Sequence, residues 1–299
     1  MTLPLLPMLA TSSPPFDSSE HLFEIKWDGV RAMAAVEADH WRLWGRRGAD
    51  YTERYPELAV VRRLPPGTIV DGEVVVLAQG RAQLSAVLRR HQLRRPEQVR
   101  HASRHSPVHY LLFDLLFHGG RSLLKEPLGR RRAALAEMLT GLSDPRLGFS
   151  EDLVGSGREL FERAVAAGHE GIMAKQRGSR YWPGRRSPAW RKIKPVHTVP
   201  CLIIGYTPGP QGLYSLLVAG LFEGSLRYAA ELTRGFGAGQ KAELARRLAG
   251  RRRPGPVVFC PKKAVWVEAE LYCRVRFLRW TTAGRLREAR FGGLLENSA

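Results

Sequence analysis

Residues 21–32 read HLFEIKWDGVRA and place one lysine, Lys26, between a strand-like run and an Asp-Gly pair. Apolar and polar residues alternate up to Lys26, which is the pattern of a half-buried strand. An Asp-Gly pair after such a run is typical of a tight turn. Lys26 is therefore expected at the end of a strand, with the carboxylates of Glu24 and Asp28 close to it in sequence.

Around this stretch, the first 195 residues mix short strands with helices. We predict strands at residues 22–27, 31–37, 41–46, 68–78, 108–117 and 170–175. We predict amphipathic helices at residues 55–64, 128–139 and 157–168. Turns join the strands as often as helices do, and this arrangement predicts a largely antiparallel α+β domain.

The remaining residues have a different pattern, with several short strands, Gly and Pro turns and one helix at residues 238–250. Strand-like pieces occur at residues 201–209, 214–224, 226–232, 264–281 and 285–291. Several strands with a single helix are typical of a small β-barrel of the OB type, a common nucleic-acid platform. The sequence therefore predicts two domains, residues 1–195 and residues 196–299.

The composition indicates a folded protein with a polyanionic partner. The chain has 299 residues, 44% of them hydrophobic, which excludes a disordered or fibrous protein. Lys and Arg number 47 against 28 acidic residues, so the formal net charge is +19. Because neutralised phosphates release counterions, this excess favours nucleic acid as the partner. An arginine-rich proteome would give the same composition without such a partner.

The cysteines and the first residues indicate a cytoplasmic protein. Cys201, Cys260 and Cys273 form no CxxC pair, so neither a disulfide framework nor a zinc site is expected. The start, MTLPLLPMLATSSPPF, is broken by prolines and has no basic leader, so we expect no signal peptide. No run reaches the length of about 18 apolar residues that a membrane span requires.

Further charged motifs follow Lys26 along the chain. They are GRRG with Arg46 and Arg47, DGEVV with Asp71 and Glu73, FDLLF with Phe113, EGIMAK with Glu170 and Lys175, and WRKIK with Lys192 and Lys194. The last two lysines share one face of a strand because alternate residues point the same way. An amine is nucleophilic only when deprotonated, and nearby cations or a metal favour that form.

The ordered set KxDG, RxG, DGE, an aromatic residue before DLL, EGxxxK and KxK resembles the covalent nucleotidyltransferases, which are ATP-dependent DNA ligases, RNA ligases and messenger-RNA capping enzymes. Longer strings, including LFEIKWDGVRA and EGIMAKQRGSRYWPGRRSPAWRKIK, most closely resemble the ligase domain of the bacterial end-joining ligase D family. The similarity extends from about Pro7 to Leu294.

The resemblance implies a nucleotidyltransferase (adenylation) domain followed by an OB-fold domain. It also implies a three-step reaction, in which Lys26 attacks the α-phosphorus of ATP and forms lysyl-AMP. The AMP then moves to the 5′-phosphate at a DNA nick, and the 3′-hydroxyl displaces it. Because such chemistry depends on positioning and charge neutralisation, the site needs carboxylates, fixed cations and a metal ion, Mg²⁺ or Mn²⁺.

The resemblance assigns roles to the other motif residues. The residues expected to contact the nucleotide are Glu24, Arg31, Arg46, Glu73, Phe113, Lys175, Lys192 and Lys194. Glu73 and Glu170 are the candidate metal ligands, and Phe113 is expected to stack on adenine. Phe113 could equally be a core residue that packs on leucines. The residues expected to contact DNA are Asp28, Arg47, Arg180, Arg185 and Arg186, although the last three could belong to a solvated surface loop.

The chain departs from the family at residues 291–299, FGGLLENSA. The family has a stretch similar to FLGLRxDK there, and Leu295 and Ser298 stand where its cations are expected. The first step is then either slow or assisted by Arg285, Arg287 or Arg290. Two alternatives to a DNA ligase remain open, a nick- or end-binding protein that no longer adenylates itself and an RNA ligase or capping enzyme.

The resemblance also indicates partners. Nicked duplex DNA is the expected substrate of a monomeric, nucleoid-associated protein. A Ku-like end-binding protein is a further expected partner, and polymerase and phosphoesterase activities would come from other chains.

Overall fold

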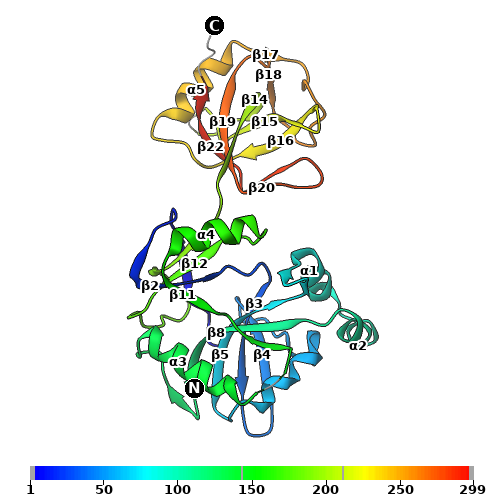
Figure 1. The fold of residues 1–299 in the computed structure, drawn as a ribbon. Coiled ribbons are helices and arrows are strands. Elements are labelled where there is room, and N and C mark those ends of the chain that lie inside the picture. The colour runs from blue at the N-terminus through cyan, green and yellow to red at the C-terminus, as the bar shows by residue number, and fades with distance from the viewer. Residues whose placement is uncertain (1–3, 143, 211, 296–299) are drawn as a thin grey trace. The chain divides into compact units, whose positions relative to one another are not determined.

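The computed structural model describes residues 4–142, 144–210 and 212–295. The chain divides into two compact units, Met1–Lys194 and Pro195–Ala299, next to the predicted boundary (Figure 1). Each unit has its own hydrophobic core. Among the described residues, none of the helices combines the length and hydropathy that a bilayer span requires.

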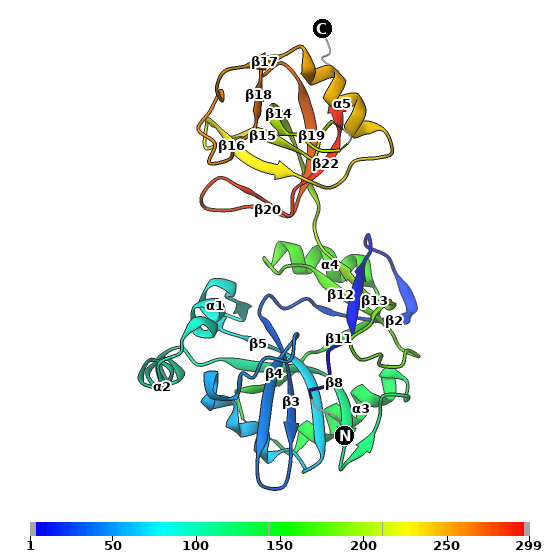
Figure 2. The ribbon, with the colours of Figure 1, turned by 180° about the vertical axis from the view of Figure 1, so that it is seen from behind.

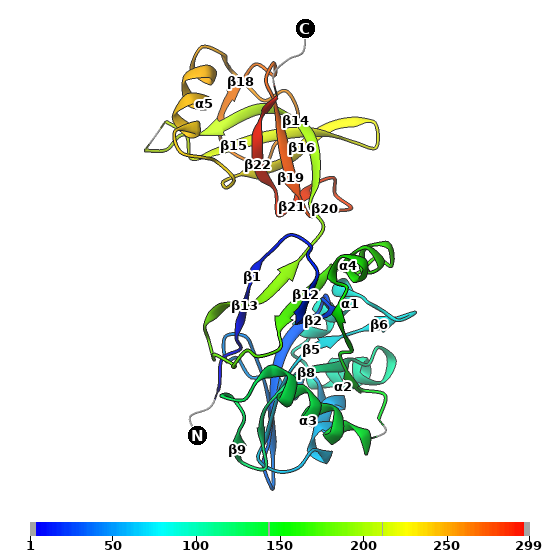
Figure 3. The same ribbon diagram turned by 60° about the vertical axis from the view of Figure 1, so that its left-hand side comes forward.

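The first unit contains two main sheets. One has five strands in the spatial order β1 (Leu9–Ser12), β13 (Arg186–Ile193), β12 (Ile172–Gln176), β2 (Ser18–Ile25) and β11 (Asp152–Gly155). The strands β1 and β13 run parallel and lie side by side (Figure 3), whereas the other pairs in this sheet are antiparallel. The helix α4 (Gly157–Ala166) packs on β2 and β12.

The other sheet has its main strands in the order β10 (Leu147–Phe149), β8 (His109–His118), β5 (Thr68–Val75), β3 (Val30–Val36) and β4 (Trp41–Gly45). Figure 2 shows β3, β4 and β5 side by side. A short strand, β9 (Arg121–Ser122), pairs with β8, and the hairpin of β6 (Leu77–Ala78) and β7 (Arg81–Ala82) follows β5. The helices of this part are η1 (Thr52–Arg54), η2 (Pro56–Arg63), α1 (Leu84–Gln92), α2 (Pro96–His105) and α3 (Leu128–Thr140).

Alternation along β3 shows how the sheets are layered. Met33 and Ala35 join a buried cluster with Leu22 of β2 and Trp190 of β13, so this cluster lies between the two sheets. Their neighbours along β3 point to the opposite face and join a cluster with η2 and α1. The space between the two sheets is therefore a shared interior, and it also contains the site described below.

The second unit is built on a seven-stranded antiparallel sheet and one helix, α5 (Gln240–Ala249). Its strands are β14 (His197–Thr207), β15 (Ser215–Phe222), β16 (Ser225–Leu232), β17 (Arg252–Arg253), β18 (Val265–Val267), β19 (Tyr272–Phe277) and β22 (Arg290–Leu295). The long strand β14 pairs with β15, β18 and β19, which curves the sheet around a common core. A separate hairpin joins β20 (Arg279–Trp280) and β21 (Leu286–Arg287).

The helix predicted at residues 55–64 is present, but its geometry is 3₁₀ rather than α. These residues form the 3₁₀-helix η2, Pro56–Arg63, which starts at a proline and contains the β-branched pair Val60 and Val61. β-Branched side chains disfavour an α-helix, and a short connecting run is where 3₁₀ geometry is common. The helices α1 and α2 were not predicted; they are only nine and ten residues long, and α2 buries a single residue, Val99.

Candidate active site

Lys26 lies where the chain crosses from one sheet of the first unit to the other. The strand β2 ends at Ile25, and β3 of the second sheet begins at Val30. The backbone N–H of Lys26 donates a hydrogen bond to the carbonyl of Gly171 at 2.9 Å, which fixes the crossing segment to the start of β12. Lys26 is thus placed at the end of a strand, as its sequence context predicts.

Two lysines share the carboxylate of Glu170. The Nζ atom of Lys26 lies 2.5 Å from Oε2 of Glu170, and the Nζ atom of Lys194 lies 2.6 Å from Oε1. All three side chains are largely but not fully buried. Burial alone would raise the pKa of the Glu170 carboxyl, but the two ammonium groups hold it below its ordinary value. One carboxylate between two cations leaves a local excess of positive charge, as a phosphate-binding site requires.

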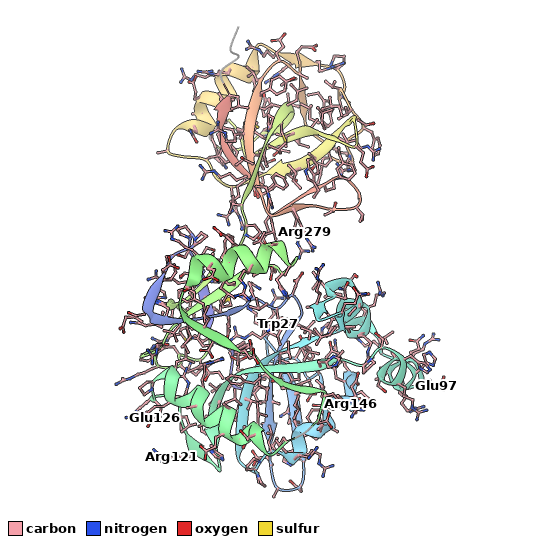
Figure 4. All side chains as sticks on the ribbon, viewed as in Figure 1. Trp27, Glu97, Arg121, Glu126, Arg146 and Arg279 are labelled. Atoms are coloured by element: carbon pink, nitrogen blue, oxygen red, sulfur yellow. The ribbon has the colours of Figure 1, made fainter. Side chains whose placement is uncertain are left out.

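A pocket of about 390 Å³ opens beside this group. Nine of the predicted active-site and nucleotide-contacting residues line it, namely Glu24, Lys26, Arg31, Arg46, Glu73, Phe113, Lys175, Lys192 and Lys194. Trp27 also lines it and lies between the two sheets (Figure 4). The size is in the range of pockets that hold a small molecule.

Arg31 is held rigidly at the pocket wall. Its guanidinium forms two hydrogen bonds to the carboxylate of Asp71, at 3.0 and 2.6 Å, and a third to the carbonyl of Met8 at 2.7 Å. The hydroxyl of Tyr181 donates to the same carboxylate at 2.6 Å. This bidentate arrangement fixes the plane of the guanidinium, which a lysine at this position would not do.

Phe113 is both a pocket residue and a core residue. Its side chain is only 7% exposed and belongs to the cluster between the sheets, which agrees with the packing interpretation. The Nζ atom of Lys175 lies 3.9 Å from the centroid of its ring and 4.3 Å from that of Trp190. Lys175 is buried and forms an ion pair with Glu24. Adenine stacking on Phe113 stays a prediction.

Glu73 and Glu170 differ in how they could hold a metal ion. Burial raises the pKa of the Glu73 carboxyl to about 7, although Lys26 and Arg31 oppose the shift. Glu73 lines the pocket and therefore fits a divalent cation, whose charge would favour the ionised form. Both oxygens of Glu170 are paired with lysines, so a metal ion there would have to displace one of them.

A metal ion at this site would also need ligands from the substrate. Among the described residues no group of three or more His, Cys, Asp or Glu side chains could hold a metal ion. Mg²⁺ commonly takes one or two protein carboxylates and completes its shell with water and substrate phosphates. The pocket therefore fits a metal that arrives with the nucleotide.

The residues predicted to contact DNA lie mostly outside the pocket. Asp28 is half-buried, and the side chains of Arg47, Arg180 and Arg185 are exposed and do not line it. Arg186 is exposed, lines the pocket and donates a hydrogen bond to the carbonyl of Ala10. Arg46 is exposed at the same pocket.

Sequence reasoning missed several pocket residues. Trp190 alternates with Lys192 and Lys194, so the same two-residue period that grouped the lysines indicated it. Met173 alternates with Lys175 in the same way. Leu9 and Ala10 of the short strand β1 had no comparable signal, because a four-residue strand near prolines has no clear period.

Comparison with known proteins places both units in one family. Residues 7–194 match the model of the ATP dependent DNA ligase domain, and residues 210–297 match that of the ATP dependent DNA ligase C terminal region. The multifunctional non-homologous end joining protein LigD of Pseudomonas aeruginosa is 33% identical over 308 residues, covering 98% of this chain and 36% of that protein. The Mycobacterium tuberculosis LigD is 35% identical over 309 residues, covering 97% and 38%.

Solved structures agree with this result. The ligase domain of M. tuberculosis LigD matches with 31% identity and a TM-score of 0.58, covering 98% of this chain and 96% of that one. A mycobacterial DNA ligase D in complex with ATP and MES matches with 31% identity, a TM-score of 0.57 and the same coverage. The prediction of an α+β nucleotidyltransferase domain followed by an OB-fold domain is confirmed. The chain spans a little over a third of the length of the curated relatives it matches.

Proposed function

This chain belongs to the family of ATP-dependent DNA ligases, and on that premise we propose that it seals nicks between a 5′-phosphate and a 3′-hydroxyl, with Lys26 carrying AMP. The observation that supports this most strongly is the pair of lysines on Glu170 at the edge of a nucleotide-sized pocket. Salt bridges at a protein surface are commonly exposed and weak, whereas both lysines and the carboxylate they share are largely buried.

In the first step Nζ of Lys26 attacks the α-phosphorus of ATP. The deprotonated Nζ forms the N–P bond as the P–O bond to pyrophosphate breaks, and the proton that leaves the nitrogen passes to water. Glu170 orients Nζ through the 2.5 Å contact. Lys192 and Lys194 line the same pocket and neutralise the phosphate charge that develops. Arg31, Glu24, Lys175 and Phe113 form the part of the pocket proposed to hold the nucleoside.

In the second step the AMP passes from Lys26 to the 5′-phosphate of a nick, and in the third the 3′-hydroxyl displaces AMP. Arg46 and Arg186 stand exposed at the pocket and are the proposed contacts of the nick phosphates. The exposed arginines Arg47, Arg180 and Arg185 are proposed to contact the phosphate backbone, with Asp28 beside the nick.

The proposed metal ion is Mg²⁺ or Mn²⁺, held by Glu73 with Glu170 as a second proposed ligand. When bound, it would neutralise charge on the substrate phosphates. Glu73 is suited to this role because its carboxyl lies in the pocket and its pKa of about 7 leaves it ready to ionise when a cation arrives.

The test is the mass of the intact protein after incubation with ATP and a divalent metal, and again after addition of nicked duplex DNA. We expect a gain of one AMP that disappears as the nick is sealed. Lys26→Ala should gain none while keeping its fold. The matched control Lys125→Ala removes an exposed lysine that does not line the pocket and should gain AMP as the wild type does. An adenylate on Lys26→Ala would refute the assignment.

A second candidate is a protein with an impaired first step, and Leu295 favours it. Leu295 ends β22 and pairs with Tyr272, at a position where the family carries a cation. Ser298, the other departing position, lies outside the described residues. Joining of pre-adenylated nicks without any gain of AMP from ATP would establish this alternative. Adenylation of RNA ends in preference to DNA would instead favour an RNA ligase.

The proposed pathway is end joining during DNA repair, because the relatives named above are non-homologous end joining proteins. A Ku-like end-binding protein is the proposed partner in the nucleoid. A Ku-like protein should then stimulate the joining of double-strand ends more than the sealing of a nick. Equal stimulation of both would argue against this pathway.

A further inference from the structure

Arg132 is a buried arginine of α3 whose donors are all used. Arg132 is only 3% exposed. A guanidinium group has five N–H donors, and Arg132 makes five hydrogen bonds. Nε and Nη2 both donate to Oδ1 of Asp152, Nε at 3.0 Å. Nη1 donates to Oε2 of Glu24 at 3.0 Å and to the carbonyl of Phe113 at 2.9 Å. Nη2 also donates to the carbonyl of Ser150 at 2.5 Å. Its ring neighbour is Phe149, 4.5 Å from the guanidinium carbon.

The partners of Arg132 come from both sheets. Glu24 belongs to β2 and Asp152 to β11 of one sheet, where the two residues are opposite each other. Phe113 belongs to β8 of the other sheet, and Ser150 follows β10 of that sheet. Arg132 therefore joins the two sheets at the side of the pocket that contains Glu24 and Phe113.

Two of these partners lead directly into the pocket. Oε1 of Glu24, the oxygen that Arg132 does not use, forms the ion pair with Lys175. The Nζ atom of Lys175 lies over the rings of Phe113 and Trp190, and all four residues line the pocket. Substitution of Arg132 would therefore alter the pocket in two ways, because the side chain of Glu24 and the backbone of Phe113 would each lose a hydrogen bond.

We propose that Arg132 is a positioning residue that fixes Glu24, Lys175 and Phe113 in the arrangement that receives the nucleotide. The inference rests on the proposed function and deepens it, since it assigns nucleotide affinity to a residue that does not line the pocket. Lysine could keep the charge but not five bonds in one plane, so only arginine can hold both sheets at once.

Stability alone does not account for Arg132. Desolvating a guanidinium is costly, and apolar residues of similar volume often stabilise a core as well as a buried ion pair does. Arg90 of α1 provides the comparison, because it is also 3% exposed and is paired with one carboxylate, Glu57, at 2.6 Å. Its Nε and Nη1 have no hydrogen-bond partner, and it does not line the pocket. Unlike the pair at Arg90, the network at Arg132 is fully satisfied and includes the pocket residues Glu24 and Phe113.

The experiment measures the dissociation constant of ATP by calorimetry and the kinetics of lysyl-AMP formation, for the wild type, Arg132→Gln and the control Arg90→Gln. Arg132→Gln should weaken ATP binding and raise KM by about tenfold, because the pocket residues lose their support. The maximal rate of adenylation should change by less than about threefold, since Lys26, Glu170 and Lys194 are not attached to Arg132. Arg90→Gln should lower the thermal stability without weakening ATP binding.

Several outcomes would overturn the inference. The inference is wrong if Arg132→Gln folds and binds ATP as tightly as the wild type. It is also wrong if Arg90→Gln loses as much ATP affinity as Arg132→Gln does. If Arg132→Gln does not fold, Asp152→Ala replaces it, because Asp152 accepts two of the five bonds and does not line the pocket. Asp152→Ala should weaken ATP binding in the same direction by a smaller factor, and unchanged affinity would count against Arg132.

The two proposals fail in different ways. A wild type that binds ATP and never gains AMP would overturn the proposed first step, while the effect of Arg132→Gln on ATP binding would still decide the positioning role. A wild type that gains AMP, with Arg132→Gln binding ATP as tightly, would overturn the positioning role alone. A wild type that does not bind ATP would overturn both.

Discussion

Among single residues, Glu73 is notable because burial shifts the pKa of its carboxyl well above the ordinary value. It lies beside Arg31 in the register of β3 and β5 and faces the pocket that contains Lys26. Two nearby cations would keep an exposed carboxyl ionised, yet burial outweighs them here and raises the pKa to about 7. The raised pKa predicts that protonation of Glu73 stabilises the folded protein when no metal ion is bound.

Glu73 should make the folded protein less stable as the pH rises. The pKa is about 7 in the folded protein and 4.5 in the ordinary state, so the folded protein binds this proton more tightly. The resulting stabilisation is complete below pH 4.5 and is lost as the pH rises through 7. Denaturant unfolding without nucleotide or metal gives the free energy of unfolding between pH 5 and 8. As the pH rises across this range, the stability of Glu73→Gln should increase relative to that of the wild type. A difference that does not vary with pH would contradict this.

The sequence identified the residues whose chemistry is explicit in a motif. Lys26, Glu170 and Lys194 belong to such motifs, and the structure brings both lysines within hydrogen-bond distance of Glu170. Arg132 could not be found in this way, because it sits in GRRRAAL among other arginines that look equivalent in sequence. Only its packing against two sheets distinguishes it from its exposed neighbour Arg130.

Among the elements, the antiparallel pair β12 and β13 supplies one wall of the site. Alternate residues of β13 carry Trp190 and Lys192 to the pocket, and Lys194 follows one residue after the strand. The residue that begins this wall is Gly171, with φ at +136°. An added Cβ there would lie 2.1 Å from the carbonyl oxygen of Ile193, so no side chain fits without moving the strand.

Gly171→Ala should therefore disturb both stability and chemistry. The strained backbone should cost about 1–3 kcal/mol. The carbonyl of Gly171 also accepts the hydrogen bond from the Lys26 backbone, so lysyl-AMP formation should slow as well. Chemical denaturation and single-turnover adenylation measure the two effects. Gly178→Ala is the control, because nothing lies within 4 Å of an added Cβ there and both quantities should be unchanged. If Gly171→Ala changes neither the stability nor the rate of adenylation, β13 can move enough to accommodate the added Cβ.

Long apolar elements were predicted, whereas short elements rich in charged residues were not. The strand β8 matches the prediction at residues 108–117 because its ten residues are almost all apolar and buried. The helices α1 and α2 were missed because they are short and rich in arginine and histidine, although their apolar residues lie on one face. The parallel strands β1 and β10 are short and depend on partners far away in sequence.

At the scale of the whole molecule, the chain consists of two units with separate cores, and the change of pattern near residue 195 indicated this division. Leu295, where the resemblance predicts a cation, lies in the second unit, whereas Lys26 lies in the first. We propose that the departure at this position slows the first step, and the following substitution tests this.

The double substitution Leu295→Arg with Ser298→Lys should speed lysyl-AMP formation at saturating ATP. Each added cation would neutralise charge on the departing pyrophosphate, and one such contact is commonly worth about 10²-fold in rate. Rapid-quench measurement with labelled ATP gives the rate, and the joining of pre-adenylated nicks serves as the control that should not change. No increase would mean that another cation already serves, with Arg285, Arg287 and Arg290 as the candidates.

The parallel pairing of β1 with β13 also determines when the pocket can form during synthesis. Leu9 pairs with Arg186, so the two strands are separated by most of the first unit. At about 5–20 residues per second, a ribosome needs on the order of ten seconds or more to make the intervening chain. During that interval residues 9–12 have no strand to join, and Trp190 has not been translated. A nascent chain that does not yet include β13 therefore has no completed pocket with which to bind ATP.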